Sequence, residues 1–244
     1  MEKWRNENGE VDQLRQGIFL VHSRSISWLP HNSLKWEPGP LYPNSLMASA
    51  ECGCRLNKKS FVTFHSNDGH NVREFAIRES LKPEETWEEN GKWQPEDTWQ
   101  GTTTKRWGPG CGATNYHLVV AGGVSSWDVV LSTVEVYVIE SKAHLIGGDM
   151  KQARAFFNIV PIGTSQLRLL AIGGRNSTSI LKSSEWWEEE DNRWGEGLSL
   201  STGRSSFGVV LAQASQTCTK IQPPPHSCPL SNGLRCEFPA VPGQ

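Results

Sequence analysis

The residues of this sequence whose types and spacing could do chemistry are few. His65 and His70 form the only close histidine pair; a metal site would need further ligands in a matching geometry, so we expect both to be loop residues. Cys52-Gly-Cys54 lacks the Cys-x-x-Cys spacing of redox sites and predicts a structural disulfide or buried thiols. The sequence contains neither a Gly-x-Ser-x-Gly elbow nor a His-Glu-x-x-His motif. It therefore offers no candidate catalytic, cofactor-binding or metal-binding residue.

Two glutamate–arginine pairs share one spacing. Glu135 precedes Arg154 by 19 residues, and Glu185 precedes Arg204 by the same interval. One alternative is that these charges line a functional site. We expect instead that they do the same structural job in each repeat, by pairing or by bonding backbone between strands and neighbouring repeats. A buried charge without such a partner is costly.

The elements that must position these residues belong to a repeat of about 50 residues. Tryptophan or its substitute recurs at intervals of 57, 51 and 50 residues, at Trp36, Trp93, His144 and Trp194. An apolar run ends in Gly122-Gly123, and a second one ends in Gly173-Gly174. Each Gly-Gly pair predicts a strand end at which the backbone needs positive φ or close approach, not a phosphate-binding loop.

Each repeat is predicted to hold about four short strands and no amphipathic helix. After the Gly-Gly strand comes a second strand at Leu131–Ile139 or Leu181–Trp187, carrying the glutamate. A last strand at Ala155–Val160 or Ser206–Leu211 leads into the next repeat. The first two repeats are degenerate: in the first, Ser27 stands where glutamate is expected.

The order of apolar run with Gly-Gly, then Glu, Trp and Arg-x-x-Phe resembles the kelch repeat. The resemblance covers roughly residues 17–212, with departures such as His144 for Trp and Glu51 for Arg. It implies an all-β fold, a kelch-like β-propeller of about four four-stranded blades. One alternative is that the ring closes through pairing of Ser206–Leu211 with Gly17–Val21. The other, which we favour, is that the chain is an incomplete ring or part of a larger one.

Three segments are predicted along the chain. Residues 1–16 form an N-terminal extension, residues 17–212 the kelch-like repeats, and residues 213–244 a Pro/Cys-rich C-terminal tail. The six cysteines are candidate disulfide partners with open connectivity: Cys52, Cys54, Cys111, Cys218, Cys228 and Cys236. Because three tail cysteines cannot pair among themselves, at least one would bridge to the repeats if all are oxidised. Asn176-Ser-Thr178 is a candidate glycosylation sequon on an expected surface loop.

Composition limits the classes of partner. The net charge is −2 and the basic residues are scattered, which disfavours a nucleic-acid binder. The sequence contains no apolar run long enough to predict a membrane span. No signal peptide is recognisable, whereas the cysteines and the sequon favour an extracellular protein over a cytoplasmic one; the compartment stays open.

The resemblance does not transfer an activity, because one fold can serve many roles. We expect a non-enzymatic module that binds an unknown protein partner, without a cofactor. Its binding surface would be the loops on one propeller face, including Val124–Asp128, Arg175–Ser179 and Ser66–Asn71. Two alternatives are a galactose-oxidase-like or other propeller enzyme, or its inactive remnant, and an extracellular lectin-like or matrix module. The oxidase would need a ligand set of two tyrosines and histidine, for which Tyr42, Tyr116 and Tyr137 show no supporting pattern.

Overall fold

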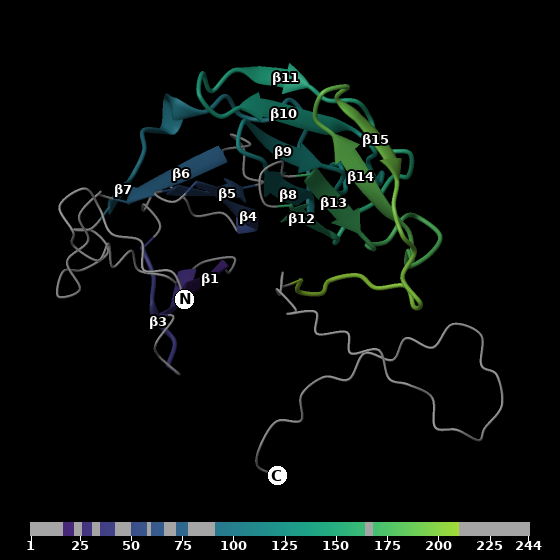
Figure 1. Ribbon diagram of the computed structural model, residues 1–244, viewed down its shortest axis with the longest axis horizontal. Coiled ribbons are helices and arrows are strands. Elements are labelled where there is room, and N and C mark those ends of the chain that lie inside the picture. Colours follow the sequence, from purple (N-terminus) through teal and green to yellow (C-terminus); the bar gives the residue numbers. More distant parts are fainter. Residues whose placement is uncertain are drawn as a thin grey trace, which may run out of the picture. The chain divides into compact units, whose positions relative to one another are not determined.

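A computed structural model shows an all-β chain of antiparallel sheets (Figure 1). It describes residues 17–21, 26–30, 35–41, 50–57, 60–65, 72–77, 91–163 and 168–209. The chain divides into two compact units, Met1–Val209 and Val210–Gln244. The predicted segments 1–16 and 213–244 lie outside the described residues, as do the three tail cysteines and His70. Within the described part, no helix is long and apolar enough to cross a membrane.

The first two sheets follow each other along the chain. Sheet 1 has the strand order β1-β2-β3, with β1 at Gly17–Val21, β2 at Ile26–Pro30 and β3 at Glu37–Pro38. Sheet 2 has the order β4-β5-β6-β7, at Ala50–Asn57, Ser60–His65, Val72–Ile77 and Gly91–Trp93. A short 3-10 helix, Glu96–Thr98, follows sheet 2.

The next two sheets repeat the same up-and-down order. Sheet 3 joins β8, β9, β10 and β11, at Gly110–Ala113, His117–Ala121, Val134–Val138 and His144–Ile146. Sheet 4 joins β12, β13, β14 and β15, at Asn158–Ile162, Arg168–Ile172, Ser184–Glu188 and Arg193–Glu196. The prediction of an all-β chain with about four short strands per repeat is confirmed for these sheets.

Sheets 2, 3 and 4 share one register between their third and fourth strands. The residue at the predicted Trp position faces an aromatic ring of the third strand in each sheet, in the pairs Phe75–Trp93, Tyr137–His144 and Trp187–Trp194. Aromatic cross-strand pairs stabilise a sheet through side-chain contact. The repeat seen in the sequence is therefore also a repeat of strand register.

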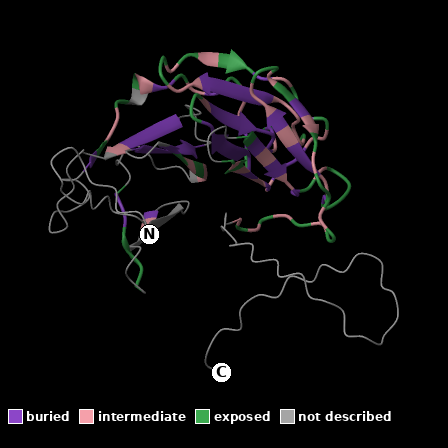
Figure 2. Ribbon diagram, viewed as in Figure 1, coloured by how far each residue is buried: buried purple, intermediate pink, exposed green. Residues whose placement is uncertain are grey.

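Successive sheets pack through their faces. The first strand of sheet 3, β8, contacts both β4 and β12. One face of sheet 3 joins sheet 2 in a buried apolar cluster that includes Leu118 and Val120. Its other face joins sheet 4 in a second cluster that includes Val119 and Val136. Alternating side chains of one strand thus enter two cores, and Figure 2 shows the burial along these central strands.

The strand that ends each predicted repeat belongs instead to the next sheet. Residues predicted as the last strand, Ala155–Val160, contribute to β12, which pairs with β13. The second predicted strand is also shorter than expected, at Val134–Val138 and Ser184–Glu188. The physical reason is that β12 bonds to the following Gly-Gly strand, whereas the preceding strand β11 bonds only to β10.

The sheets do not close on each other within the described residues. Residues 206–209 form no strand there, and β1 pairs with β2 alone. Val210 and Leu211, the end of the predicted closing strand, lie outside the described part of the chain. In the described part of the chain, sheet 1 accordingly has three strands and no counterpart of β4, β8 and β12.

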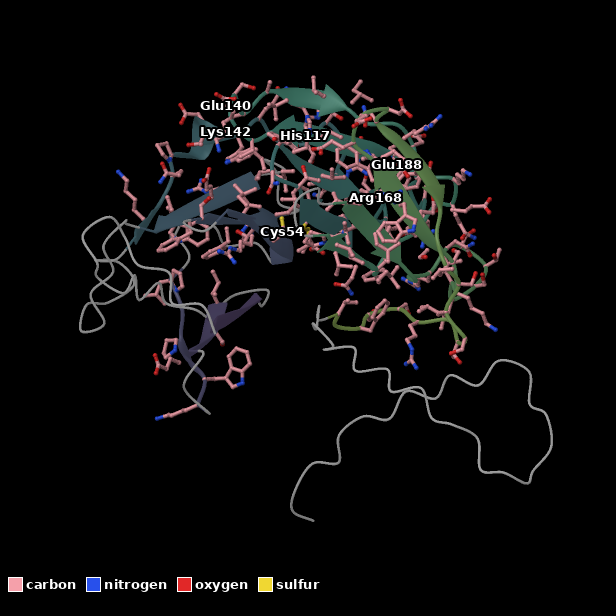
Figure 3. The ribbon with its side chains drawn as sticks, viewed as in Figure 1. Cys54, His117, Glu140, Lys142, Arg168 and Glu188 are labelled. Carbon is pink, nitrogen blue, oxygen red and sulfur yellow. A yellow bond between two sulfur atoms is a disulfide. The ribbon has the colours of Figure 1, made fainter. Side chains whose placement is uncertain are left out.

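One disulfide joins sheets 2 and 3. Cys52 on β4 bonds to Cys111 on β8, 59 residues apart in sequence. Cys54, two residues from Cys52, is the free cysteine of the described chain (Figure 3). It is half-buried against the core that sheets 2 and 3 share. Burial raises the pKa of the Cys54 thiol from 9.0 to about 12 because the thiolate would lose its hydration.

Cys54 is expected to resist alkylation in the folded protein. A pKa of about 12 instead of 9.0 lowers its thiolate fraction about 1000-fold at pH 8, and the thiolate is the reactive form. Iodoacetamide labelling followed by non-reducing peptide mapping should find Cys52 linked to Cys111 and Cys54 unlabelled until denaturant is added. The unfolded thiol ionises first, so the free energy of unfolding should fall as pH rises from 9.0 to about 12. Rapid labelling of native Cys54 would contradict its burial.

Candidate functional site

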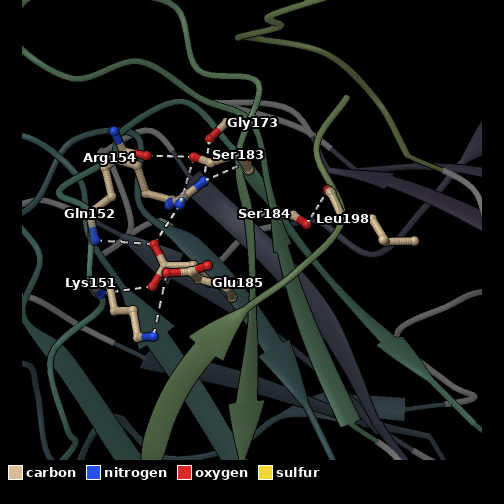
Figure 4. Close-up of polar contacts among 9 residues, drawn as sticks. Lys151, Gln152, Arg154, Gly173, Ser183, Ser184, Glu185 and Leu198 are labelled. Carbon is tan, nitrogen blue, oxygen red and sulfur yellow. Dashed lines mark hydrogen bonds and ion pairs between the residues drawn. The ribbon is translucent and has the colours of Figure 1, made fainter. Parts of the chain in front are cut away.

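Arg154 lies in the connection between sheets 3 and 4 and reaches into sheet 4 (Figure 4). Its guanidinium donates to Glu185 Oε1 at 2.5 Å and to the carbonyl oxygens of Gly173 and Ser183 at 2.8 and 3.1 Å. Arg154 is fully buried and Glu185 almost so. The pair therefore has the hydrogen bonds that a buried ion pair needs.

The same arrangement occurs one repeat earlier. Arg106 donates to Glu135 Oε1 at 2.8 Å, and to the carbonyl oxygens of Gly122 and Thr133, both at 2.9 Å. We call each set an arginine clamp: an arginine, the glutamate of the next sheet and the carbonyl of the first Gly in Gly-Gly. Two clamps built alike indicate a structural part of the repeat.

The glutamates and arginines pair between neighbouring repeats and not at the 19-residue spacing. Glu135 does not pair with Arg154, nor Glu185 with Arg204; each glutamate takes the arginine of the preceding connection. Arg204 is exposed. Glu51, aligned with these arginines in the sequence, instead lies within β4, and its carboxylate accepts a hydrogen bond from the Gly108 amide at 2.9 Å.

Backbone amides complete the clamps. Glu185 accepts from the amides of Lys151 and Gln152, at 2.7 and 3.1 Å. Glu135 accepts from the amide of Thr103 at 2.8 Å, and its Oε2 lies 2.9 Å from His144 Nε2. His144 thus adds a polar partner to the glutamate at a position where sheet 4 has Trp194. This contact gives a physical reason for His in place of Trp.

The Gly-Gly pairs are required by the packing of these arginine segments. Gly122 and Gly173 have φ of 62° and 60°, and each following glycine is also at positive φ. A Cβ on Gly122 would lie 2.2 Å from the Arg154 carbonyl oxygen. The second glycine, Gly123, donates its amide to that same oxygen at 2.9 Å. Glycine is the residue that tolerates both the conformation and the close approach.

The connections after the Gly-Gly pairs carry exposed apolar residues. In residues 124–130, the Ser125 hydroxyl accepts from the amides of Trp127 and Val129, both at 3.3 Å, and the Ser125 amide donates to the Val129 carbonyl at 2.9 Å. Asp128 closes this turn with φ of 56°. Trp127 is nonetheless 85% exposed. Local bonds therefore hold a bulky apolar ring in water.

Neighbouring segments extend this feature. Trp107 forms a β-bridge with Val124, and Lys105 Nζ lies 5.6 Å from the Trp107 ring. The Phe156 amide donates to the Gly108 carbonyl, and the Arg175 guanidinium stacks 4.7 Å from the Phe156 ring. We call these exposed residues the loop surface: Trp107, Trp127, Val129, Arg175 and Ile180.

Asn176 lies in the loop that corresponds to the Trp127 turn. Its side-chain oxygen accepts from the amides of Thr178 and Ser179, at 2.9 and 2.8 Å, and from the Thr178 hydroxyl at 3.0 Å. Thr178 and Ser179 are exposed and Asn176 is half-buried. The sequon thus forms an ordered turn that is held through the side-chain oxygen of Asn176.

A different polar group lies at the other end of β9. Glu189 Oε1 accepts from the Thr114 hydroxyl at 2.5 Å and lies 2.6 Å from His117 Nδ1. Both contacts use one carboxylate oxygen, and Thr114 and His117 do not form the nucleophile–base hydrogen bond of covalent catalysis. The group joins a turn of sheet 3 to a turn of sheet 4, which is a cross-sheet contact.

The remaining histidine and tyrosine predictions can be placed. His65 is not a loop residue: it ends β5, is fully buried and lies 2.9 Å from the Thr63 hydroxyl. Tyr137 is buried, and burial together with Glu135 raises the pKa of its phenol. Tyr116 is 68% exposed. Among the residues that the structure describes, no three His, Cys, Asp or Glu side chains gather as a metal site would require.

Sequence reasoning missed Arg106 and the amides that bind each glutamate. Arg106-Trp107-Gly108 parallels the segment from Arg204 to Gly208, and that likeness was the signal that Arg106 belongs to the same repeat position. The predicted loops Val124–Asp128 and Arg175–Ser179 do lie in the connections after Gly-Gly, while residues 66–71 lie outside the described chain. Compared with known proteins, the sequence matches no family model and no curated protein.

Proposed function

We propose that this chain is a kelch-like propeller array that binds a protein partner through the loop surface. Three features support the proposal. Each sheet is an up-and-down meander of consecutive strands, as in a propeller blade. Sheets 2, 3 and 4 share a register, and the arginine clamps join each repeat to the next.

The observation that carries the binding role is Trp127. An 85% exposed tryptophan on a turn held by four local hydrogen bonds contributes no burial to the fold. Tryptophan is among the residues most enriched at binding hot spots, and a fixed turn reduces the entropy lost on binding. Loops on a rigid scaffold are where such sites commonly lie.

A peptide-display selection tests this role even though the partner is unidentified. Peptides selected on the intact protein should bind the Trp127→Ala variant at least about tenfold more weakly, as expected for a hot-spot truncation. Tyr116→Ala is the matched control, because Tyr116 is an exposed ring at the other end of β9. Neither substitution should shift the unfolding midpoint.

Two results would contradict the proposal. One is a selection whose peptides bind Trp127→Ala and the parent chain equally. The other is a set of peptides that lose affinity only with Tyr116→Ala, which would move the binding role to the opposite loops.

The second candidate, an extracellular lectin-like or matrix module, has one observation in its favour. The Cys52–Cys111 disulfide is of the kind that persists in oxidising compartments. Peptide mapping of protein from its native source, as described for Cys54, decides between them: reduced Cys52 and Cys111 would remove this support.

A further inference from the structure

Among the described residues, no further sheet packs on the outer face of sheet 4, the face turned away from sheet 3. Val160, Leu170 and Trp186 form one cross-strand row on this face, and all three are half-buried. The strand positions of Leu170 and Trp186 correspond to Val119 and Val136 in sheet 3, which are 0% and 2% exposed against sheet 4. The row is therefore placed where, one repeat earlier, the next sheet packs.

Arg204 is positioned like a clamp arginine that has no glutamate. The Gly174 amide donates to the Arg204 carbonyl at 2.7 Å, as the Gly123 amide does to Arg154 at 2.9 Å. Ser206 has φ of 53° and donates to the Phe156 carbonyl, repeating the conformation and bond of Phe156 itself. Yet the Arg204 side chain is exposed and has no ion-pair partner among the described residues. Its backbone is set for insertion into a further sheet.

Sheet 1 has the complementary feature. In sheets 3 and 4 the predicted Trp position lies on the face that the preceding sheet covers: Trp194 is 4% exposed, and the His144 side chain 7%. Trp36, the residue directly before β3, is 44% exposed. Among the described side chains of sheet 1, Trp36 is thus exposed on the side on which sheets 3 and 4 receive a neighbour.

We infer that the outer face of sheet 4 docks sheet 1 of a second copy of this chain. The contact would continue the packing that joins sheets 2, 3 and 4, with Trp36 of one copy against the Trp186 row of the other. Within the described residues of one chain, the strands of sheet 1 are not packed on sheet 4, which favours a partner copy over contact within one chain. Such a head-to-tail contact closes as a ring of copies or extends as a filament.

Arg204 would fit the second copy's sheet 1 although Ser27 replaces glutamate there. In both clamps of the chain, one guanidinium nitrogen donates to two backbone carbonyl oxygens, and these bonds do not depend on the glutamate. The Ser27 hydroxyl can accept a further hydrogen bond. The strands β2 and β3 contain no Lys or Arg, so the Arg204 guanidinium would not be repelled by a cation of these strands.

Sedimentation equilibrium of the full chain over a wide concentration range tests the inference. The 27.2 kDa chain should associate reversibly to at least twice its mass. Trp186→Glu and Trp36→Glu should each weaken association at least about tenfold. Lys92→Glu, a charge substitution at an exposed position of β7 in another sheet, should not. Circular dichroism on each variant checks that it folds.

Mixing identifies the geometry. Trp186→Glu keeps sheet 1 intact and Trp36→Glu keeps sheet 4 intact, so an equimolar mixture retains one undamaged interface and should form a heterodimer. A chain that stays monomeric at all concentrations overturns the inference. Association that survives both substitutions also overturns the inference. So does association that is lost with Trp186→Glu but kept with Trp36→Glu, because that result would mean that sheet 4 of one copy contacts sheet 4 of the other. None of these results bears on the loop surface, which lies elsewhere in the repeat.

Discussion

Replacing Trp194 by alanine is expected to lower the free energy of unfolding by about 3–5 kcal/mol, as for other large aromatic side chains removed from a core. Trp194 is 4% exposed, faces Trp187 across β14 and β15, and belongs to the cluster between sheets 3 and 4. Its indole nitrogen has no hydrogen-bond partner among the described residues, so the loss arises from packing. Urea unfolding followed by circular dichroism measures the change.

Trp36→Ala is the matched control within the same chain. Trp36 occupies the corresponding repeat position but is 44% exposed, so its loss should change the free energy of unfolding by less than about 0.5 kcal/mol. Both variants are compared at a protein concentration at which the chain is monomeric. Equal losses at the two positions would show that the repeat position does not have the burial described for sheet 4.

Arg154→Ala is expected to destabilise the chain by about 3–5 kcal/mol, because it leaves the Glu185 carboxylate buried without its partner. Both side chains are at most 3% exposed, and the arginine also satisfies the carbonyls of Gly173 and Ser183. Arg204→Ala removes the corresponding but exposed arginine and should have little effect on the monomer. The same unfolding titrations give both values.

A double variant separates the charge effect from the packing effect. Replacing Arg154 by methionine and Glu185 by leucine removes both charges, so it should recover much of the stability lost in Arg154→Ala, as apolar replacements of buried ion pairs often do. If the double variant is at least as unstable as Arg154→Ala, the carbonyl and amide bonds of the clamp outweigh the unpaired charge.

The repeat pattern predicted strand content and the Gly-Gly turns, because both are set locally. The four glycines of the Gly-Gly pairs combine positive φ with a neighbouring backbone within contact distance, and both requirements favour glycine. The sequence did not identify the clamp partners, because a spacing of 19 residues relates the glutamate and arginine of one repeat only. In space, the connection carrying Arg154 belongs with the following sheet, where Glu185 lies.

Tertiary packing decided what the sequence left open. Cys52 and Cys111 are 59 residues apart, and only the packing of β4 beside β8 brings them together. The turn at Trp127 was predicted as a loop, but the exposure of its ring depends on the Ser125 bonds. The sequence gives no reason for His144 at a Trp position, whereas the structure shows that its ring contacts the Glu135 carboxylate.

The direction of the arginine clamps has a consequence for biosynthesis. In each clamp the arginine precedes its glutamate, by 31 residues for Arg154 and Glu185. At roughly 5–20 residues per second, the ribosome delivers the cation about 2–6 s before the acid. A solvated guanidinium has no desolvation cost, whereas a carboxylate that becomes buried in a core without its counter-ion has a large one. Synthesis from the N-terminus therefore supplies each new sheet with its cation before that sheet can fold.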